Sequence, residues 1–247
     1  TKSGSGTLTL SGANSYGGGT NINSGVLTLG SSSAIGSGGT ISFGGGVLKA
    51  FDTVDYSNRF STADNQQYSI DTNGQNITWA TSLVSLGGSL TKTGSGTLTL
   101  SGANTYNGVT TISAGTLVAA HATALGSTTG GTTVASTATL DIQAAIGLEA
   151  ITLNGGTIST TATGGSLGGT INLAANSIVS ASSALNLTLS GVIATSTSSS
   201  LTKAGAGTVT LAGINTYTGV TTISAGTLAI GSAGSLGSGS YAGTIAN

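Results

Sequence analysis

A sixteen-residue segment occurs three times in this chain of 247 residues. Thr1–Tyr16 returns almost unchanged as Thr91–Tyr106 and again as Thr202–Tyr217. Repetition at long period is typical of stacked supersecondary units, each of which buries its apolar face against its neighbours. The chain is therefore expected to be an array of stacked units.

The composition indicates a folded chain with little charge. Only 4% of the residues are charged, against about 25% in ordinary domains, yet the β-branched and aliphatic residues that disordered segments lack are abundant. The net charge of −1 provides no basic surface, which argues against nucleic acid and anionic lipid as partners. The absence of Cys excludes disulfides, thiolate metal ligands and a Cys nucleophile.

Short strands are indicated along the whole chain. Segments such as Thr97–Leu100 and Val109–Ile112 alternate hydroxyl and aliphatic residues at period two, and Gly, Ser and Asn clusters separate them. A Gly-x-Leu motif recurs at a constant offset within the copies, at Gly6 and Gly25 and at Gly96 and Gly115. A step of roughly 20 residues fits one coil of a parallel β-helix with two or three strands.

We therefore predict an all-β fold, a parallel β-helix of about a dozen coils and about 55 to 60 Å in length. One continuous β-helix would span residues 1–247, with repeat copies at about 1–30, 91–120 and 202–231 and a divergent, loop-bearing region at about 43–79. No apolar run is long enough to span a membrane.

The long spacing of the copies limits what their polar residues can do. The copies begin at Thr1, Thr91 and Thr202, which places them about four to five coils apart, so their Asn-x-Tyr motifs cannot form one continuous ladder. We interpret each motif as a local turn, in which Asn bonds backbone and Tyr covers the edge of the core. The recurring lysines are interpreted as solvated turn residues that deter sideways strand pairing. The residues concerned are Asn14, Tyr16, Asn104, Tyr106, Asn215 and Tyr217, and Lys2, Lys92 and Lys203.

These repeats resemble the autotransporter-associated β-strand repeat, also called the passenger-associated transport repeat. The resemblance lies in Leu90–Tyr106 continuing through Gly108–Leu117, in Leu201–Leu228, and in a degraded copy at Thr1–Leu29. It implies a right-handed parallel β-helix that belongs to a secreted or surface-displayed protein of a Gram-negative bacterium. In that family the passenger is exported across the outer membrane, and the repeat is thought to assist its passage and folding.

Most of the unusual side chains fall between Phe43 and Trp79. Aromatic rings beside Asp and Arg are typical of glycan or protein contacts. The candidate contact residues are Phe51, Asp52, Asp55, Tyr56, Arg59, Tyr68 and Trp79. The alternative is a loop that bulges from the solenoid, with charges paired at its surface and aromatic rings packed on the coil below.

The sequence favours a structural role, as a rigid stalk or adhesin scaffold, over catalysis. The acids of this region match no calcium loop, and no catalytic, cofactor or metal site is predicted. The alternatives are a fibre stacked end to end through open β-helix edges and a carbohydrate-binding module. Ice binding would need Thr-x-Thr ranks on adjacent coils. The expected partners are a second copy of the chain or a host or cell-surface protein or glycan, without nucleic acid and without direct membrane insertion.

Overall fold

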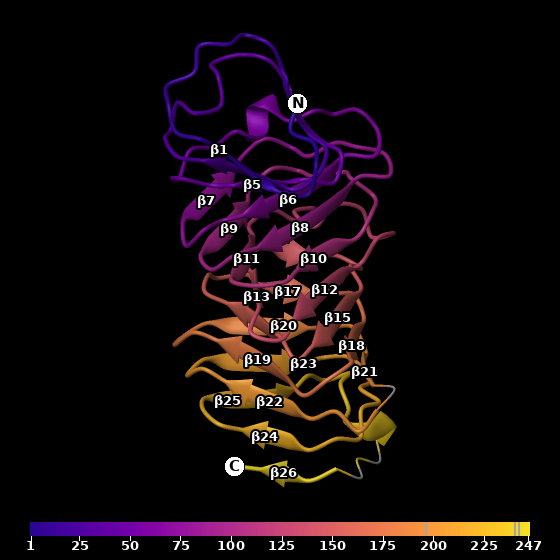
Figure 1. The fold of residues 1–247 in the computed structure, drawn as a ribbon. Helices are drawn as coiled ribbons and strands as arrows, with labels where there is room; N and C mark the ends of the chain where they lie inside the picture. The colour runs from indigo at the N-terminus through magenta and orange to yellow at the C-terminus, as the bar shows by residue number, and fades with distance from the viewer. Residues whose placement is uncertain (196, 240, 242) are drawn as a thin grey trace.

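The structure is a solenoid of parallel β-strands. The computed structural model describes residues 1–195, 197–239, 241 and 243–247. The strands wind into about 11 turns with almost no helix, and the chain passes once along the long axis from the N-terminus to β26 (Figure 1). The predicted all-β parallel β-helix is thereby confirmed. None of the helices described is long and apolar enough to cross a membrane.

Three long faces carry the turns. The first sheet has ten strands: β1 (Thr7–Leu10), β3 (Val26–Leu29), β5 (Val47–Lys49), β6 (Gln67–Asp71), β8 (Ser89–Thr93), β10 (Thr110–Ile112), β12 (Thr132–Ala135), β15 (Ile151–Asn154), β18 (Ile171–Leu173) and β21 (Ile193–Ala194). The second sheet has nine: β7 (Asn76–Trp79), β9 (Thr97–Leu100), β11 (Thr116–Ala119), β13 (Thr139–Ile142), β16 (Thr157–Thr160), β19 (Ser177–Ala181), β22 (Leu201–Ala204), β24 (Thr221–Ile223) and β26 (Ile245–Ala246).

The remaining strands form two smaller sheets. The third sheet consists of β14 (Ala145–Ile146), β17 (Ser166–Leu167), β20 (Asn186–Leu189), β23 (Thr208–Leu211) and β25 (Thr227–Ile230), and the short sheet consists of β2 (Thr20–Ile22) and β4 (Ile41–Phe43). Strands β2 and β4 of the short sheet and β14 and β17 of the third sheet each come directly before a first-sheet strand. The two sheets therefore lie on the same face of the solenoid. Two 3-10 turns are η1 (Ser57–Arg59) and η2 (Gly237–Gly239).

The core consists of aliphatic columns that run along the solenoid. On the first sheet Leu8, Leu27, Leu48 and Ile70 occupy one column, because each is in register with the next. The strands β3, β5 and β6 alternate buried, mainly aliphatic side chains with partly exposed ones, as period-two strands with one buried face do. Packing between turns therefore uses the same few residue types again and again.

The three repeat copies lie on successive faces of the solenoid. The strand with the Thr-Leu-Thr-Leu pattern is β1 on the first sheet in copy one, β9 on the second sheet in copy two and β23 on the third sheet in copy three. In each copy the chain then crosses one face without a strand and returns to the preceding sheet. Each copy is thus turned by one face relative to the copy before it.

The strand register explains the uneven spacing of the copies. From Leu8 to Lys92 the first-sheet column takes four steps, and β9 follows one face later in that turn. From Leu98 to Lys203 the second-sheet column takes five steps, and β23 again follows one face later. The second interval between copies is therefore longer than the first by one turn, and each interval includes one additional face.

The part of the divergent region between β5 and β6 belongs to a turn of ordinary length. Leu48 and Ile70 are neighbours in one column, and the same interval along the chain separates Ile70 from its next neighbour, Lys92. Between β5 and β6 the described structure has only η1 and the bridge from Ile41 to Phe60. The segment that carries these unusual side chains therefore takes the place of a regular strand. It is not an insertion into the solenoid.

Candidate functional site

Two of the seven candidate contact residues belong to the core. Tyr68 is 1% exposed and Trp79 is 2% exposed. Trp79 packs edge-on against Phe60, with 4.8 Å between ring centroids, and Phe60 packs edge-on against Phe43 at 5.0 Å. The Tyr68 hydroxyl donates to the Ser61 carbonyl at 2.8 Å. Their inclusion in a contact surface was wrong, because these rings fill the interior where aliphatic columns are interrupted.

Arg59 and Asp55 bond backbone groups, and most of these groups lie on neighbouring turns. The Arg59 guanidinium donates to the carbonyls of Ile35 at 3.0 Å and Gly36 at 2.8 Å, and also to those of Gly38 and Gly39. The Asp55 carboxylate accepts from the Ser57 amide at 2.7 Å and from the Ala80 amide at 3.0 Å. Both side chains hold turns together.

The remaining three candidates lie at the surface. Phe51 is 48% exposed, and Asp52 accepts from the Val54 amide at 3.1 Å. The Tyr56 hydroxyl donates to the Ser32 carbonyl at 3.0 Å, and burial raises the Tyr56 pKa. Tyr56 and Arg59 line a hollow of about 480 Å³ against residues 13–15 and 32–37. Phe51, Asp52 and Tyr56 therefore remain as candidates for a contact.

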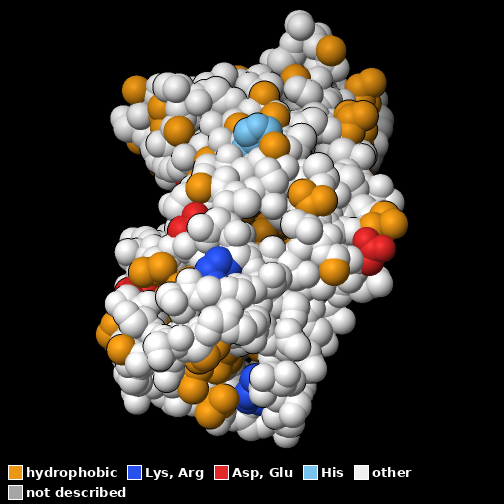
Figure 2. All heavy atoms as spheres, turned by 90° about the horizontal axis from the view of Figure 1, so that it is seen from above, with side chains coloured by type: hydrophobic (Ala, Val, Ile, Leu, Met, Phe, Trp, Pro, Cys, Tyr) orange, Lys and Arg blue, Asp and Glu red, His pale blue; other side chains and the backbone are white. Residues whose placement is uncertain are grey.

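Charged groups at the surface are sparse. In Figure 2 the few Lys, Arg, Asp and Glu side chains are scattered among uncharged atoms, and Lys49 Nζ lies 3.6 Å from an Asp71 carboxylate oxygen. Among the described residues, no group of three or more His, Cys, Asp and Glu side chains is placed to hold a metal ion. The polar residues that recur in the copies are buried in the second and third copies, and Lys2 is buried in the first.

The recurring lysines are interior residues. Lys92 and Lys203 are 0% exposed and Lys2 is 6% exposed. Lys92 stands in the first-sheet column between Ile70 and Ile112, a place that aliphatic side chains fill in the other turns. The interpretation of these lysines as solvated turn residues was wrong, because the two-residue period directs them inward.

Each lysine ammonium is enclosed by three carbonyl oxygens, an arrangement that we call the lysine cage. Lys92 Nζ donates to Thr93 at 2.9 Å, to Gly94 at 2.7 Å and to Ala114 of the following turn at 3.1 Å. The three oxygens satisfy the three donors of an ammonium group. Burial lowers the Lys92 pKa to about 8, and nearby Asp71 opposes this shift. The ammonium form therefore still predominates at pH 7.

The same lysine cage is present in the other two copies. Lys203 Nζ donates to Ala204, Gly205 and Ala225 at 2.8, 2.7 and 2.9 Å. Lys2 Nζ donates to Ser3, Gly4 and Ser24 at 3.2, 2.7 and 2.8 Å. In the described part of the chain, no carboxylate forms a salt bridge with any of these three ammonium groups. The direct partners of the three ammonium groups are therefore backbone carbonyls.

A glycine of the following turn makes room for the lysine cage. Gly115 has φ +66°, and a Cβ at this position would lie 2.5 Å from the Gly96 carbonyl oxygen and 2.9 Å from Lys92 Nζ. The corresponding Gly25 has φ +67° and would meet Lys2 Nζ at 2.6 Å. Only a residue without a Cβ fits such a position without strain. The glycine that follows Ser24 or Ala114 is therefore part of the lysine cage.

The repeated asparagines connect turns rather than closing local ones. Asn104 Oδ1 accepts from the Leu83 amide of the preceding turn at 2.8 Å, and its Nδ2 donates to the Ala124 carbonyl of the following turn at 2.6 Å. In the third copy, Asn215 likewise accepts from Ile193 at 2.9 Å and donates to Ser235 at 3.0 Å. The predicted bonding to backbone is confirmed: Asn215 Nδ2 also donates to the Gly213 carbonyl of its own turn at 2.9 Å, but the other partners lie on the neighbouring turns.

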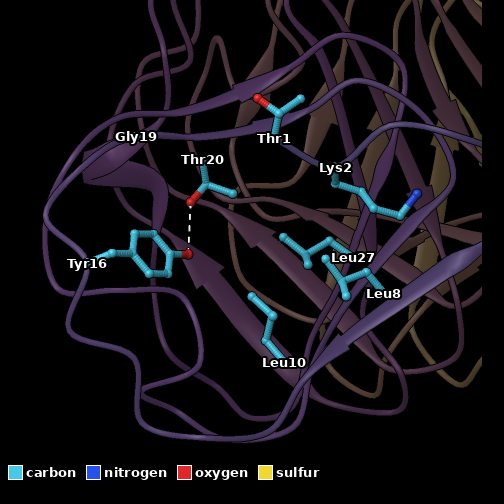
Figure 3. Close-up of a pocket in the computed structure, with 8 residues that line it drawn as sticks. All are labelled: Thr1, Lys2, Leu8, Leu10, Tyr16, Gly19, Thr20 and Leu27. Carbon is cyan, nitrogen blue, oxygen red and sulfur yellow. Dashed lines mark hydrogen bonds between the residues drawn. The ribbon is translucent and has the colours of Figure 1, made fainter.

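Each repeated tyrosine bonds the threonine four residues later, and in the second and third copies the tyrosine lies in the interior. Tyr106 and Tyr217 are 0% exposed, and their hydroxyls lie 2.6 and 2.8 Å from Thr110 and Thr221 Oγ1. The first copy has the same pair, Tyr16 and Thr20, at 3.1 Å (Figure 3).

In the first copy, this arrangement borders a cavity of about 280 Å³ in the N-terminal turn. The cavity is lined by Thr1, Lys2, Leu8, Leu10, Tyr16, Gly19, Thr20 and Leu27.

Glu149 is a buried acid that the sequence analysis did not single out. It is 2% exposed, its Oε1 accepts from Thr132 Oγ1 at 2.8 Å, and its Oε2 has no hydrogen-bond partner among the described residues. Burial raises the Glu149 pKa, and the bond from Thr132 opposes that shift. Folding therefore moves the titration of Glu149 to higher pH than in the unfolded chain.

Threonines do face outward on adjacent turns of the first sheet. Thr91, Thr111, Thr133 and Thr152 are in register across four turns. The residues two positions later are Thr93, Ser113, Ala135 and Asn154. Each of these turns therefore contributes one threonine to the column, and only the first has a second threonine beside it. The Thr-x-Thr ranks that ice binding would need are not repeated on these turns.

The fold and the lysine cages define a parallel β-solenoid in which one polar repeat recurs on successive faces. The family model described as Passenger-associated-transport-repeat matches residues 1–29, 90–119 and 201–230. The chain thus carries three copies of this repeat, and the resemblance drawn from the sequence is confirmed. No curated protein and no solved structure matches the chain. The repeat and the solenoid fit a structural segment of an autotransporter passenger.

The first test concerns the aromatic residues of the divergent region. Trp79→Ala is expected to lower the free energy of unfolding by about 3 to 5 kcal/mol, because it removes a buried ring from the core. Phe51→Ala, at a half-exposed position, is the matched control and should change it by less than about 0.5 kcal/mol. Chemical denaturation measures both. Equal effects of the two substitutions would contradict the assignment of Trp79 to the core.

The second test concerns Glu149. Because its folded-state pKa is raised, the stability contributed by the neutral carboxyl is complete below its unfolded pKa and is lost as pH rises through the folded value. Glu149→Gln is therefore expected to remove the part of the decline in Tm that begins as the pH rises above about 4.3. The exposed acid variant Asp64→Asn should leave the decline unchanged. Parallel pH profiles of wild type and Glu149→Gln would refute a raised pKa.

Proposed function

We propose that the chain is a rigid stalk or adhesin scaffold within a passenger that is secreted or displayed on the surface of a Gram-negative bacterium. The observation that carries the proposal is the continuity of the first sheet, whose ten strands connect turns from β1 to β21. About 11 turns at a strand spacing of about 4.8 Å give a rod about 50 Å long. The family match supports the cellular setting.

The distribution of chemistry supports a mechanical role. The recurring lysine, asparagine and tyrosine side chains form hydrogen bonds within the solenoid, most of them with backbone groups. Repeated turns with nearest-neighbour contacts extend length at a constant cross-section. A host or cell-surface protein or glycan would be bound by regions that such a rod carries, and Phe51, Asp52 and Tyr56 are the surface residues of this segment that we retain for a weaker contact.

A change in length tests the stalk. Ile171 and Ile193 are neighbours in one column, so deleting residues 171–192 removes one turn and is expected to leave a folded rod shorter by about 4.8 Å. Deleting residues 171–181 removes part of a turn, brings different faces into contact and is expected to abolish cooperative unfolding. Small-angle scattering and circular dichroism measure both. Equal tolerance of the two deletions would contradict a modular rod.

The stalk role itself is tested on cells. The chain is placed between a surface anchor and an N-terminal binding domain of known ligand, on Gram-negative cells with a surface polymer layer. Ligand capture should fall when the chain is removed and return when an unrelated rod of equal length replaces it. Capture that requires this particular sequence would instead indicate direct binding by the segment.

End-to-end association of this chain is a second candidate function. Leu8 is 42% exposed and Tyr16 is 38% exposed, whereas their counterparts Leu98 and Tyr106 are 0% exposed beneath a neighbouring turn. Exposed strand edges with apolar side chains favour pairing with another strand.

Sedimentation velocity tests the second candidate. The wild-type chain should form concentration-dependent oligomers, and Leu8→Lys should reduce them because it puts a charge on the apolar edge. Val109→Lys, at a site that is also exposed but lies away from the first turn, is the matched control. A wild-type chain that remains monomeric at all concentrations would eliminate the fibre.

A further inference from the structure

The apolar pattern of this solenoid does not by itself define one alignment of adjacent turns. Strand β9 reads Thr-Leu-Thr-Leu, with Leu98 and Leu100 inward. A shift of two residues places Leu100 where Leu98 was and keeps threonine outside, so the hydrophobic pattern is preserved. A side-chain period of two excludes a slip of one residue but not of two.

The lysines respond differently to such a shift. Strand β8 has Leu90 and Lys92 inward, and a two-residue slip would displace the ammonium by about 6.7 Å along the strand. It would then lose the Ala114 carbonyl, the one cage oxygen supplied by the following turn. A buried ammonium without its acceptors is strongly unfavourable. The correct register is therefore the one that completes the lysine cage.

We propose that Lys92 and Lys203 are register locks that select a single alignment between adjacent turns. Each lock needs the ammonium, the two carbonyls that follow the lysine and one carbonyl of the next turn, Ala114 or Ala225. The glycine after that residue, Gly115 or Gly226, provides the space. This conformational role is independent of whether the segment serves as a stalk or a fibre.

The placement of the locks suits this role. Lys2 is bridged to Ile22 at the short sheet, Lys92 lies in the first sheet, and Lys203 lies in the second. They lie several turns apart on different faces. Each lysine therefore fixes the register once within a series of turns whose aliphatic side chains alone would allow more than one register. A single polar residue at an apolar position fixes register in coiled coils by the same physical argument.

Disulfide trapping tests the proposal, because the chain has no native cysteine. Thr91 and Thr111 are outward neighbours, so the pair Thr91→Cys and Thr111→Cys should cross-link in the native register. Thr93→Cys with Thr111→Cys reports the slipped register, since in the native one the two Cα atoms are about 8 Å apart, beyond disulfide reach. With Lys92 present, only the native pair should oxidise.

In the Lys92→Met background the slipped pair is expected to cross-link as well, with a matching loss of yield for the native pair. Leu90→Ala is the matched control: it removes a buried side chain from the same strand but leaves the lysine cage intact. It should lower Tm without any slipped cross-link. Exclusive native cross-linking in folded Lys92→Met would overturn the proposal.

Lys203→Met provides a second, separate measurement. Thr202 and Thr222 are register neighbours, so Thr202→Cys with Thr222→Cys reports the native alignment and Ala204→Cys with Thr222→Cys the slipped one. Slippage should appear here and not at Thr91, because the other lock is intact. If neither methionine variant folds, the lysines supply stability rather than register, and the proposal is overturned.

Discussion

The hydrogen-bond ladder between successive parallel turns is the constraint on which everything else in this structure depends. Each turn satisfies its backbone groups with the turns before and after it, and so must repeat the same path at the strand spacing. That condition admits only side chains that stack on themselves inside, which is why the first-sheet column runs Leu8, Leu27, Leu48 and Ile70. It also holds successive turns together without disulfides in a chain free of cysteine.

The buried polar residues distinguish the turns that contain them from the other, aliphatic turns. Lysine, asparagine and tyrosine of each copy bond backbone or hydroxyl groups of their own and neighbouring turns. Such groups are costly inside a core unless each bond is made, so they tolerate one arrangement where leucine tolerates several. Each copy of the repeat therefore contributes buried polar residues to an otherwise apolar core. Because each copy is turned by one face, these residues lie on a different face of the solenoid in each copy.

Much of the fold was predictable, and much of the candidate site was not. The period-two pattern and the regular recurrence of the Gly-x-Leu motif predicted the solenoid because both follow directly from strand geometry. The same pattern put Lys92 two residues after the inward Leu90, a signal of burial that the general preference of lysine for solvent obscured. The pattern likewise put Tyr68 two residues before the inward Ile70 and Trp79 two residues after the inward Ile77. The neighbouring charges obscured that signal, because aromatic rings beside charges are also typical of surface contacts.

The sequence by itself determined the class of fold, the length of the turn and the family of the repeat, because these depend on local periodicity. Only the tertiary structure decided which face each copy occupies, since that follows from the accumulated length of every intervening turn. It also decided the surroundings of Lys92 and Glu149. Their partners come from other parts of the winding chain, and burial next to those partners is a property of the stack rather than of any one segment.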